Sequence, residues 1–133
     1  MEVIITDWAL RAYVDLKHTR VFTSEEFETV IRPNVEILKE VSPFENPVFQ
    51  NSKFWGPATD RDGRKVVGGF KMKWHNMGSG RIQLRLPIFI EQGKAWLCRA
   101  YVKKDEKTDR REMGQFKIHI QMIREGYPGV GKL

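Results

Sequence analysis

The sequence of 133 residues predicts a single α+β domain, in which N-terminal helices and a C-terminal helix pack on one face of a small, mostly antiparallel β-sheet. Three observations lead to this expectation. Apolar residues recur every three or four positions towards both ends of the chain, as in amphipathic helices. In the middle they alternate with polar residues, as in half-buried strands. Hydrophobic residues make up 41% and charged residues 30%, a balance typical of a globular protein with a core.

The N-terminal part predicts a short strand and two helices. Residues 3–5 are a β-branched run that predicts the strand, and residues 8–16 carry the apolar spacing of the first helix. The second helix begins where Thr23 and Glu26 have the spacing of a capping box, and it continues to about residue 40. A proline in its middle bends or breaks it, because proline lacks the backbone N–H.

Turn-forming residues fill the stretch 42–64, and we expect it to be irregular, with its aromatic side chains packed on the body of the domain. From residue 65 the apolar residues alternate with polar ones along three segments. The turns Gly78–Ser79–Gly80 and Glu91–Lys94 separate these segments, which predicts an antiparallel meander that ends near Lys103.

The last regular element is a helix that we expect from Asp109, as its N-cap, to Arg124. Residues 126–133 contain three Gly and one Pro and predict a loose tail. We therefore expect residues 1–133 to form one domain, with this tail attached.

Strand alternation predicts one apolar and one basic face for the sheet. The apolar face, which the helices would cover, comprises Phe70, Met72, Trp74, Ile82, Leu84, Leu86 and Trp96. The opposite face comprises Lys71, Lys73, His75, Arg81, Arg85, Arg99, Tyr101 and Lys103. A face chosen only for solubility would mix both signs of charge, whereas cations with one His and one Tyr suit a polyanion with stackable bases. The alternative is a solvated face that happens to be basic.

The overall composition agrees with a phosphate-bearing or acidic partner. Lys and Arg number 23 against 17 Asp and Glu, a formal net charge of +6. The single Cys98 excludes an intramolecular disulfide and a zinc site built from several cysteines, and we expect its thiol to be buried and structural. The three His residues lack zinc-ligand spacing, so we expect no metal and no cofactor. No apolar run is long enough for a membrane helix and no signal peptide is visible, which favours a cytoplasmic protein without a membrane partner.

Two stretches resemble the RelE/ParE superfamily of bacterial toxins, and in particular its HigB-like, phage-type branch. The segment Gly78–Arg85 is similar to the family's glycine turn followed by a strand with an arginine near its start. The segment Tyr101–Thr108, followed by Arg111–Met113, is similar to the family's basic ending, with Asp109 where members usually have proline. The predicted order of strand, helices, meander and C-terminal helix is also that of the family. The irregular stretch 42–64 is not typical of it, which bears on how open the basic face is.

The resemblance implies the toxin of a type II toxin–antitoxin pair: a metal-independent, ribosome-dependent mRNA endonuclease that inhibits translation. Its partners would be mRNA, the ribosome and a cognate antitoxin protein. Arg81 matches the arginine that members place at the scissile phosphate, and Tyr101, His75 and His119 compete for the role of acid or base. The catalytic candidates are Arg81, Lys103, Tyr101 and His75. The nucleic-acid-binding candidates are Lys71, Lys73, Arg85, Arg99, Lys104 and Lys107.

The chemistry of RNA cleavage agrees with the basic face without requiring the family. Cleavage without a metal needs a base for the 2′-OH, cations for the developing phosphate charge and an acid for the leaving oxygen. A lysine whose pKa is lowered by neighbouring cations could be the base, and guanidinium groups could hold the phosphate.

Two alternatives stay open at this point. The first is a non-catalytic nucleic-acid-binding or gyrase-inhibiting protein with the same fold, since fold alone does not settle the reaction. The second is an enzyme or scaffold unrelated to nucleic acids.

Overall fold

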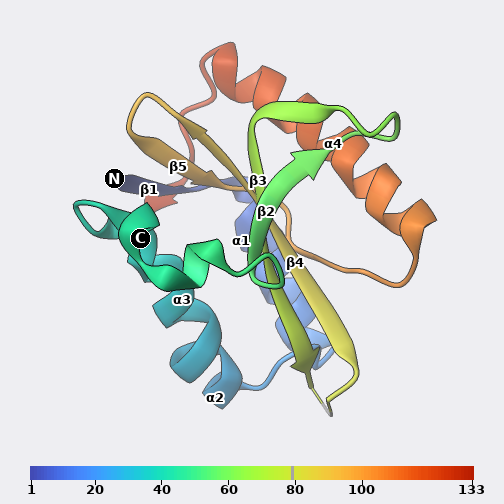
Figure 1. Cartoon of the computed structure of the whole chain (residues 1–133). Coiled ribbons are helices and arrows are strands. Elements are labelled where there is room, and N and C mark those ends of the chain that lie inside the picture. The colour runs from blue at the N-terminus through green and yellow to red at the C-terminus, as the bar shows by residue number, and fades with distance from the viewer. Residues whose placement is uncertain (79) are drawn as a thin grey trace.

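The computed structural model describes residues 1–78 and 80–133, and it confirms the α+β class: helices pack against a mixed, mostly antiparallel sheet (Figure 1). The predicted glycine turn includes Ser79, which lies outside the described residues. No helix in the described part of the chain is long and apolar enough to cross a membrane.

The elements follow the predicted order. The helices are α1 (Asp7–His18), α2 (Ser24–Glu26), α3 (Arg32–Glu36) and α4 (Glu106–Arg124). A π-helical turn (Phe27–Ile31) joins α2 to α3, and 3-10 turns follow at Ile37–Lys39, Pro43–Glu45 and Pro47–Gln50. The strands are β1 (Glu2–Ile5), β2 (Trp55–Thr59), β3 (Lys65–Met77), β4 (Ile82–Glu91), β5 (Lys94–Leu97), β6 (Tyr101–Val102) and β7 (Gly131–Lys132).

Within the described residues the sheet has the strand order β2-β3-β4-β5-β1-β7. The short strand β6 also pairs with β4, at Leu84 and Arg85, whereas β5 pairs with the later residues Ile88–Glu91. The meander β3–β4–β5 is antiparallel, as predicted, while β1 lies parallel to β5. The capping box of α2 is also present, because Thr23 and Glu26 each accept a hydrogen bond from the other's backbone N–H.

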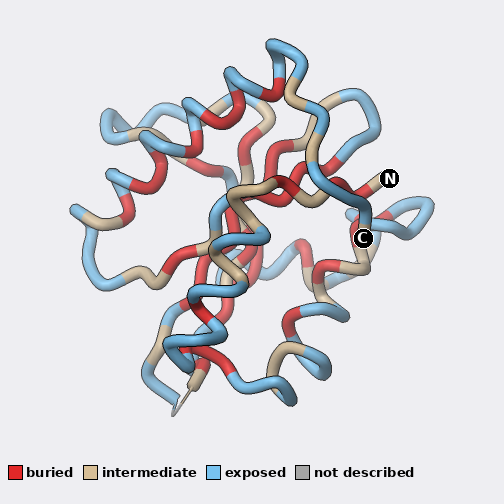
Figure 2. Tube along the Cα trace, turned by 180° about the vertical axis from the view of Figure 1, so that it is seen from behind, coloured by how far each residue is buried: buried red, intermediate tan, exposed pale blue. Residues whose placement is uncertain are grey.

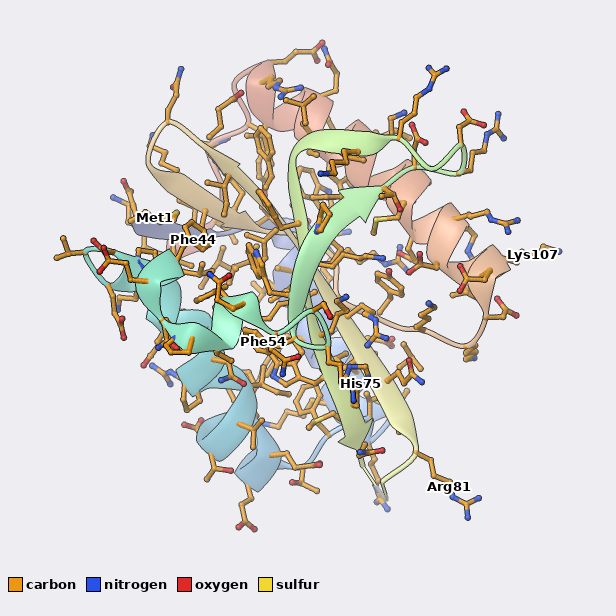
Figure 3. All side chains as sticks on the ribbon, in the orientation of Figure 1. Met1, Phe44, Phe54, His75, Arg81 and Lys107 are labelled. Atoms are coloured by element: carbon orange, nitrogen blue, oxygen red, sulfur yellow. The ribbon has the colours of Figure 1, made fainter. Side chains whose placement is uncertain are left out.

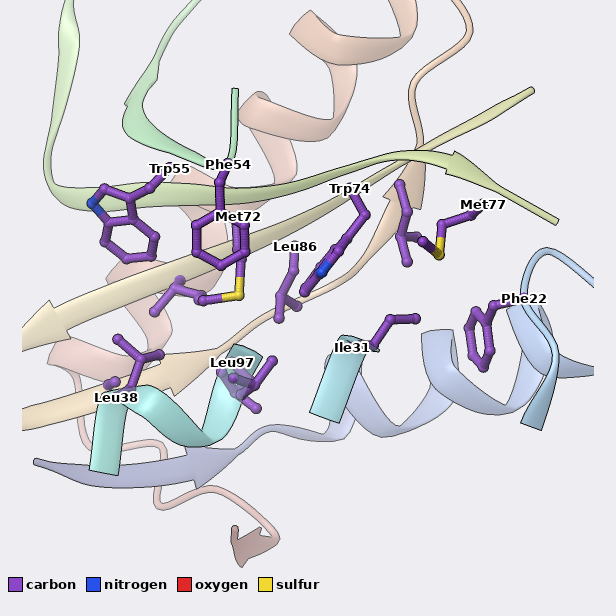
Figure 4. Close-up of a cluster of buried hydrophobic side chains, with 14 of the residues drawn as sticks. Phe22, Ile31, Leu38, Phe54, Trp55, Met72, Trp74, Met77, Leu86 and Leu97 are labelled. Carbon is purple, nitrogen blue, oxygen red and sulfur yellow. The ribbon is translucent and has the colours of Figure 1, made fainter. Parts of the chain in front are cut away.

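The larger core lies between the sheet and the segment from α1 to the 3-10 turn at Ile37–Lys39. Figure 4 shows sheet residues such as Met72, Trp74 and Leu86 facing Ile31 and Leu38, all of them buried. Trp74 and Leu84 lie opposite each other in the β3–β4 ladder and are 4% and 2% exposed, so the predicted apolar face of these two strands is confirmed.

The C-terminal helix covers the other side of the sheet, which differs from the expected placement of all helices on one face. Met113, Phe116 and Ile120 of α4 pack with Phe89 and Trp96 in a second core. Figure 1 shows α4 and the α2–α3 segment on opposite sides of the strands, and Figure 2 shows α4 buried along one side only. The helix also begins earlier than predicted, because its N-cap is Asp105, whose carboxylate accepts from the backbone N–H of Thr108.

The predicted third strand is interrupted after Leu97, and this corrects the expected position of Trp96. Pro87 has no N–H to give to the neighbouring strand. Cys98 still donates its backbone N–H to the carbonyl of Pro87, but regular strand pairing stops after Leu97 and resumes only where β6 begins at Tyr101. Alternation is therefore not continuous across the break. Trp96 packs in the α4 core, whereas its neighbour Leu97 packs in the larger core.

Two other segments are more ordered than the sequence predicts. The stretch 42–64 contains β2, and its Phe49, Phe54 and Trp55 are buried on the body of the domain as expected. The segment expected as a loose tail instead pairs with β1 through β7, and Leu133 N–H donates to the carbonyl of Val3. Backbone hydrogen bonds to an otherwise open strand edge hold it there.

Candidate functional site

Three of the predicted residues lie side by side in one row across the sheet. Lys73 of β3 is the ladder partner of Arg85 of β4, and Arg85 is in turn the partner of Tyr101 of β6. We call Lys73, Arg85 and Tyr101 the cross-strand row. The row lies on the α4 side of the sheet, since Tyr101 packs in the α4 core. Strand pairing thus brings together one amine, one guanidinium and one phenol from positions up to 28 residues apart.

Arg85 is the central member of the row and only 5% exposed. Its guanidinium donates to the carbonyls of Leu84 at 3.2 Å and Trp74 at 3.5 Å and to the Gln83 side chain at 2.8 Å. Burial lowers the pKa of Arg85, and the acidic groups of Tyr101 and Asp109 oppose that effect. A buried guanidinium with no carboxylate among these hydrogen-bond acceptors keeps its charge available for an anion.

Tyr101 lies at one end of the row and donates its phenolic proton to Asp109 in the first turns of α4. Burial, and then the hydrogen bond to Asp109, raise the pKa of Tyr101 above its usual value. The same carboxylate lies 3.4 Å from the Nζ atom of Lys71, and both of these side chains are nearly buried. Asp109 therefore joins Tyr101 to Lys71, and Tyr101 remains a proton donor at ordinary pH.

Lys73 lies at the other end of the row and donates to the carbonyl of Ser52 at 2.7 Å. Burial, and after it the positive charges of Lys71, Arg85 and Lys103, lower the pKa of Lys73. These cations therefore all lie close enough to favour the neutral amine. Among the described side chains, this is the lysine whose environment best suits it to accept a proton.

His75 lies two residues beyond Lys73 on the same face of β3, near the edge of the row. Its Nε2 lies 2.6 Å from the carbonyl of Lys53, and since a carbonyl only accepts, this nitrogen carries the proton. Ser52 and Lys53 belong to the stretch 42–64, which is not typical of the toxin family. Their loop thus contacts both Lys73 and His75. Both side chains are hydrogen-bonded to this loop, although His75 remains exposed to solvent.

Lys103 follows β6 and lies next to the row. Its backbone N–H donates to the carbonyl of Gln83, and its Nζ lies 3.0 Å from the carboxylate of Glu106 in the first turn of α4. The predicted cluster of Lys71, Lys73, Arg85, Tyr101 and Lys103 is therefore assembled in one place.

Arg81 lies apart from this cluster. It is exposed at the tip of the β3–β4 hairpin and points away from the body of the protein (Figure 3). It stands four residues before Arg85, a separation of about 13 Å along an extended strand. Figure 3 also places Lys107 at the far edge, at the start of α4.

The remaining predicted residues line a groove between α1 and α4. Arg99 and Lys104 lie on its wall beside Tyr101, and Arg99 is 3.8 Å from the carboxylate of Glu112. His119, the third candidate for acid or base, also lines this groove, but it is 7% exposed and stacks on Trp8 with ring centres 4.0 Å apart. Burial, followed by the positive charge of Arg99, lowers the pKa of His119 to about 4.

Sequence reasoning missed the role of Asp109, which it took for a helix cap. Asp109 and Glu112 are both buried on the inner side of α4, three residues apart, and each faces a cation of the predicted site. The sequence does contain a signal for these two carboxylates: Asp109 and Glu112 occupy positions that match the apolar stripe of the helix.

Two negative expectations concern metal and thiol chemistry. The described residues contain no cluster of His, Cys, Asp or Glu that could hold a metal ion. Cys98 is fully buried, and burial raises the pKa of its thiol, as expected for a structural cysteine.

Comparisons of the chain with protein-family models, with curated proteins and with solved structures give no match.

Proposed function

We propose that the protein is a metal-independent endoribonuclease that cleaves mRNA on the translating ribosome, as the toxin of a toxin–antitoxin pair. The observation that carries the proposal is the cross-strand row of Lys73, Arg85 and Tyr101 with Lys71 and Lys103 beside it. These groups match the requirements of RNA cleavage without a metal: a base, a cation for the phosphate and a proton donor.

Lys73 acts as the general base in this proposal. As a neutral amine it takes the proton of the 2′-OH, and the 2′-oxygen then forms a bond to phosphorus. The lowered pKa of Lys73 supports this role, because it increases the neutral fraction near the pH of the cell.

Arg85, with Lys71, holds the phosphate. The negative charge on the phosphate oxygens grows as the fifth bond to phosphorus forms, and a buried guanidinium interacts with it more strongly than an exposed one. The resemblance assigns this role to Arg81 instead, but the position of Arg81 at the hairpin tip suits contact with a neighbouring nucleotide.

The proton for the leaving 5′-oxygen comes from Tyr101 or His75. Tyr101 keeps its proton because of its raised pKa, and His75 is exposed beside Lys73. Cleavage of the P–O5′ bond then gives a 2′,3′-cyclic phosphate and a 5′-hydroxyl, so that the proton removed at the 2′-OH is balanced by the one donated.

A second candidate function is RNA binding without cleavage. It is favoured by the hydrogen bonds that the cross-strand row and His75 already make: Lys73 donates to Ser52, His75 contacts the carbonyl of Lys53 and Tyr101 donates to Asp109. For catalysis, the substrate must at least displace Lys73 from its hydrogen bond to the carbonyl of Ser52, so that the amine can reach the 2′-OH.

The two functions separate in a cleavage assay. Purified protein is incubated with mRNA-programmed ribosomes and with the same mRNA alone, and the ends of the products are mapped. We expect cleavage on the ribosome with cyclic-phosphate and 5′-hydroxyl ends. If the protein binds RNA but the mRNA stays intact, the catalytic proposal fails and RNA binding is the remaining function. In a separate experiment, a neighbouring gene product that restores the growth of cells expressing the protein would be identified as the antitoxin.

A further inference from the structure

The groove between α1 and α4 is large enough for a ligand of its own. Its volume is about 870 Å³, within the range of roughly 300–1,000 Å³ that small-molecule sites occupy. Leu16, Val21, Ile82 and Val102 form an apolar part of its lining. Trp8 and His119 line it from α1 and α4.

The polar lining of the groove has an excess of positive charge. The basic residues are Arg11, Arg99, Lys104 and Arg111, and the acidic ones are Asp15 and Glu112. Arg11 pairs with Asp7 and Arg99 with Glu112. Lys104 and Arg111 are exposed, so their charges can reach an anion in the groove.

His119 has unused hydrogen-bonding capacity. The residue is 7% exposed, and its Nδ1 is a buried atom without a hydrogen-bond partner among the described residues. Its ring stacks on Trp8, which also stacks on Tyr127. A buried polar atom without a partner costs free energy. Because Nδ1 is closed off from solvent, a ligand in the groove supplies its partner only when the imidazole ring or its neighbours move.

We propose that this groove binds a nucleotide of the RNA strand next to the one held at the cross-strand row, with its base at His119 and its phosphates at Lys104 and Arg111. The inference rests on the RNA-binding part of the proposed function. Tyr101 provides the continuity between the two places, since it belongs to the row and also lines the groove.

The chemistry of the lining favours a nucleotide over a chain of carboxylates. An imidazole offers one donor and one acceptor when neutral, which suits the edge of a base, and the apolar lining can pack against the base plane. The lowered pKa of His119 keeps its ring neutral at physiological pH. A purely anionic ligand would use the arginines and the lysine but neither the imidazole nor the apolar lining.

The test measures the affinity of a 2′-O-methyl hexanucleotide, which binds but lacks the free 2′-OH needed for cleavage. The first variant is the double substitution Lys104→Ala/Arg111→Ala, and the matched control is Arg61→Ala/Arg64→Ala, which removes two exposed cations from the turn before β3. We expect the groove variant to bind about tenfold or more weakly. The slope of log affinity against log salt should become shallower by about 1.4, for two phosphate contacts with single-stranded RNA. The control should match the wild type in affinity.

The second variant, His119→Phe, keeps an aromatic ring against Trp8 but removes both nitrogens. We expect a loss of about fivefold in affinity, as for one hydrogen bond to a neutral group. In the wild type, the imidazole NMR signals of His119 should shift when the hexanucleotide binds, a readout that does not depend on the stability of a variant. Hexaglutamate should bind more weakly and leave those signals in place.

Unchanged affinity in the Lys104→Ala/Arg111→Ala protein, or unmoved His119 signals with bound RNA, would overturn the inference whether or not the protein cleaves RNA. Equal affinity and equal NMR shifts with hexaglutamate would also overturn it, and would assign the groove to an acidic peptide. If groove variants weaken binding while the wild type cleaves nothing, the catalytic proposal fails and the groove assignment stands.

Discussion

Lys73 lies directly opposite Arg85 in the β3–β4 ladder, and the positive charge of Arg85 is among the causes that lower the pKa of Lys73. Two like charges in neighbouring positions of a sheet destabilise each other. In this protein the pair is accompanied by Lys71 and Lys103, while Asp109 provides the nearby opposing charge. Such an arrangement is costly for folding, and an approaching phosphate would relieve it.

The first prediction concerns the buried face of the hairpin. Leu84 is 2% exposed and lies opposite Trp74, so Leu84→Ala removes buried methyl groups and leaves a cavity. The free energy of unfolding should fall by about 2–5 kcal/mol. Urea denaturation of both proteins measures the change. A loss below about 0.5 kcal/mol would mean that Leu84 is not in the core.

The second prediction concerns the C-terminal segment. The phenolic oxygen of Tyr127 accepts a hydrogen bond of 2.7 Å from the backbone N–H of Asp7 at the start of α1. Tyr127→Phe keeps the stacking on Trp8 and removes that acceptor, which should cost about 1 kcal/mol. Thermal unfolding provides the comparison. Equal melting temperatures would show that the segment 127–133 does not hold α1.

The third prediction concerns acid stability. The folded protein keeps His119 neutral down to its lowered pKa of about 4, whereas the unfolded chain protonates it near the ordinary value of about 6.5. Acid therefore favours the unfolded chain, and His119 should lower the free energy of unfolding by about 2 kcal/mol between pH 7.5 and pH 5.

Urea denaturation at the two pH values, for the wild type and for His119→Phe, isolates this effect, because the other titrating groups are common to both proteins. The variant should lose less stability on acidification than the wild type. Parallel losses in the two proteins would contradict the buried, neutral state of His119.

The fourth prediction separates the two candidate positions for the phosphate contact. Arg81 is exposed at the hairpin tip, about 13 Å along the strand from Arg85. Arg81→Ala should leave the melting temperature unchanged and reduce the cleavage rate by less than about tenfold. The resemblance to the toxin family predicts a loss of about a hundredfold instead. Single-turnover rates on programmed ribosomes distinguish the two outcomes.

The sequence predicted the order of the elements because their periodicities are strong. The alternation through Phe70, Met72 and Trp74 places β3 correctly as far as the bulge between Trp74 and Met77, and the capping box at Thr23 places the start of α2. The side of the sheet that α4 covers was not predictable, because an amphipathic helix does not specify which face it covers. The break opposite Pro87 was missed for a related reason: alternation is local, and the effect of a missing N–H falls on the neighbouring strand.

The candidate site was predictable in its cations but not in its arrangement. Alternation alone predicts that Lys71, Lys73, Arg85 and Tyr101 share a face. The strand pairing adds that Lys73, Arg85 and Tyr101 lie in one row across β3, β4 and β6. The contact of Asp109 with Tyr101 and Lys71 joins an early turn of α4 to the sheet, and such contacts between distant segments leave no trace in local spacing. The same alternation predicted Arg81 on this face, but Arg81 lies at the tip of the β3–β4 hairpin, away from the cluster.

The most direct test of the proposed site is the Lys73→Arg substitution, assayed for single-turnover cleavage of mRNA on programmed ribosomes and for RNA affinity. Arginine keeps the positive charge but does not release its proton, so it can bind phosphate but cannot act as the base. Lys65→Arg, an exposed position on the same strand, is the matched control. We predict that Lys73→Arg lowers the cleavage rate by about a hundredfold or more, while RNA affinity stays within about threefold and the control cleaves like the wild type. A Lys73→Arg protein that cleaves at the wild-type rate would contradict the assignment of Lys73 as the base.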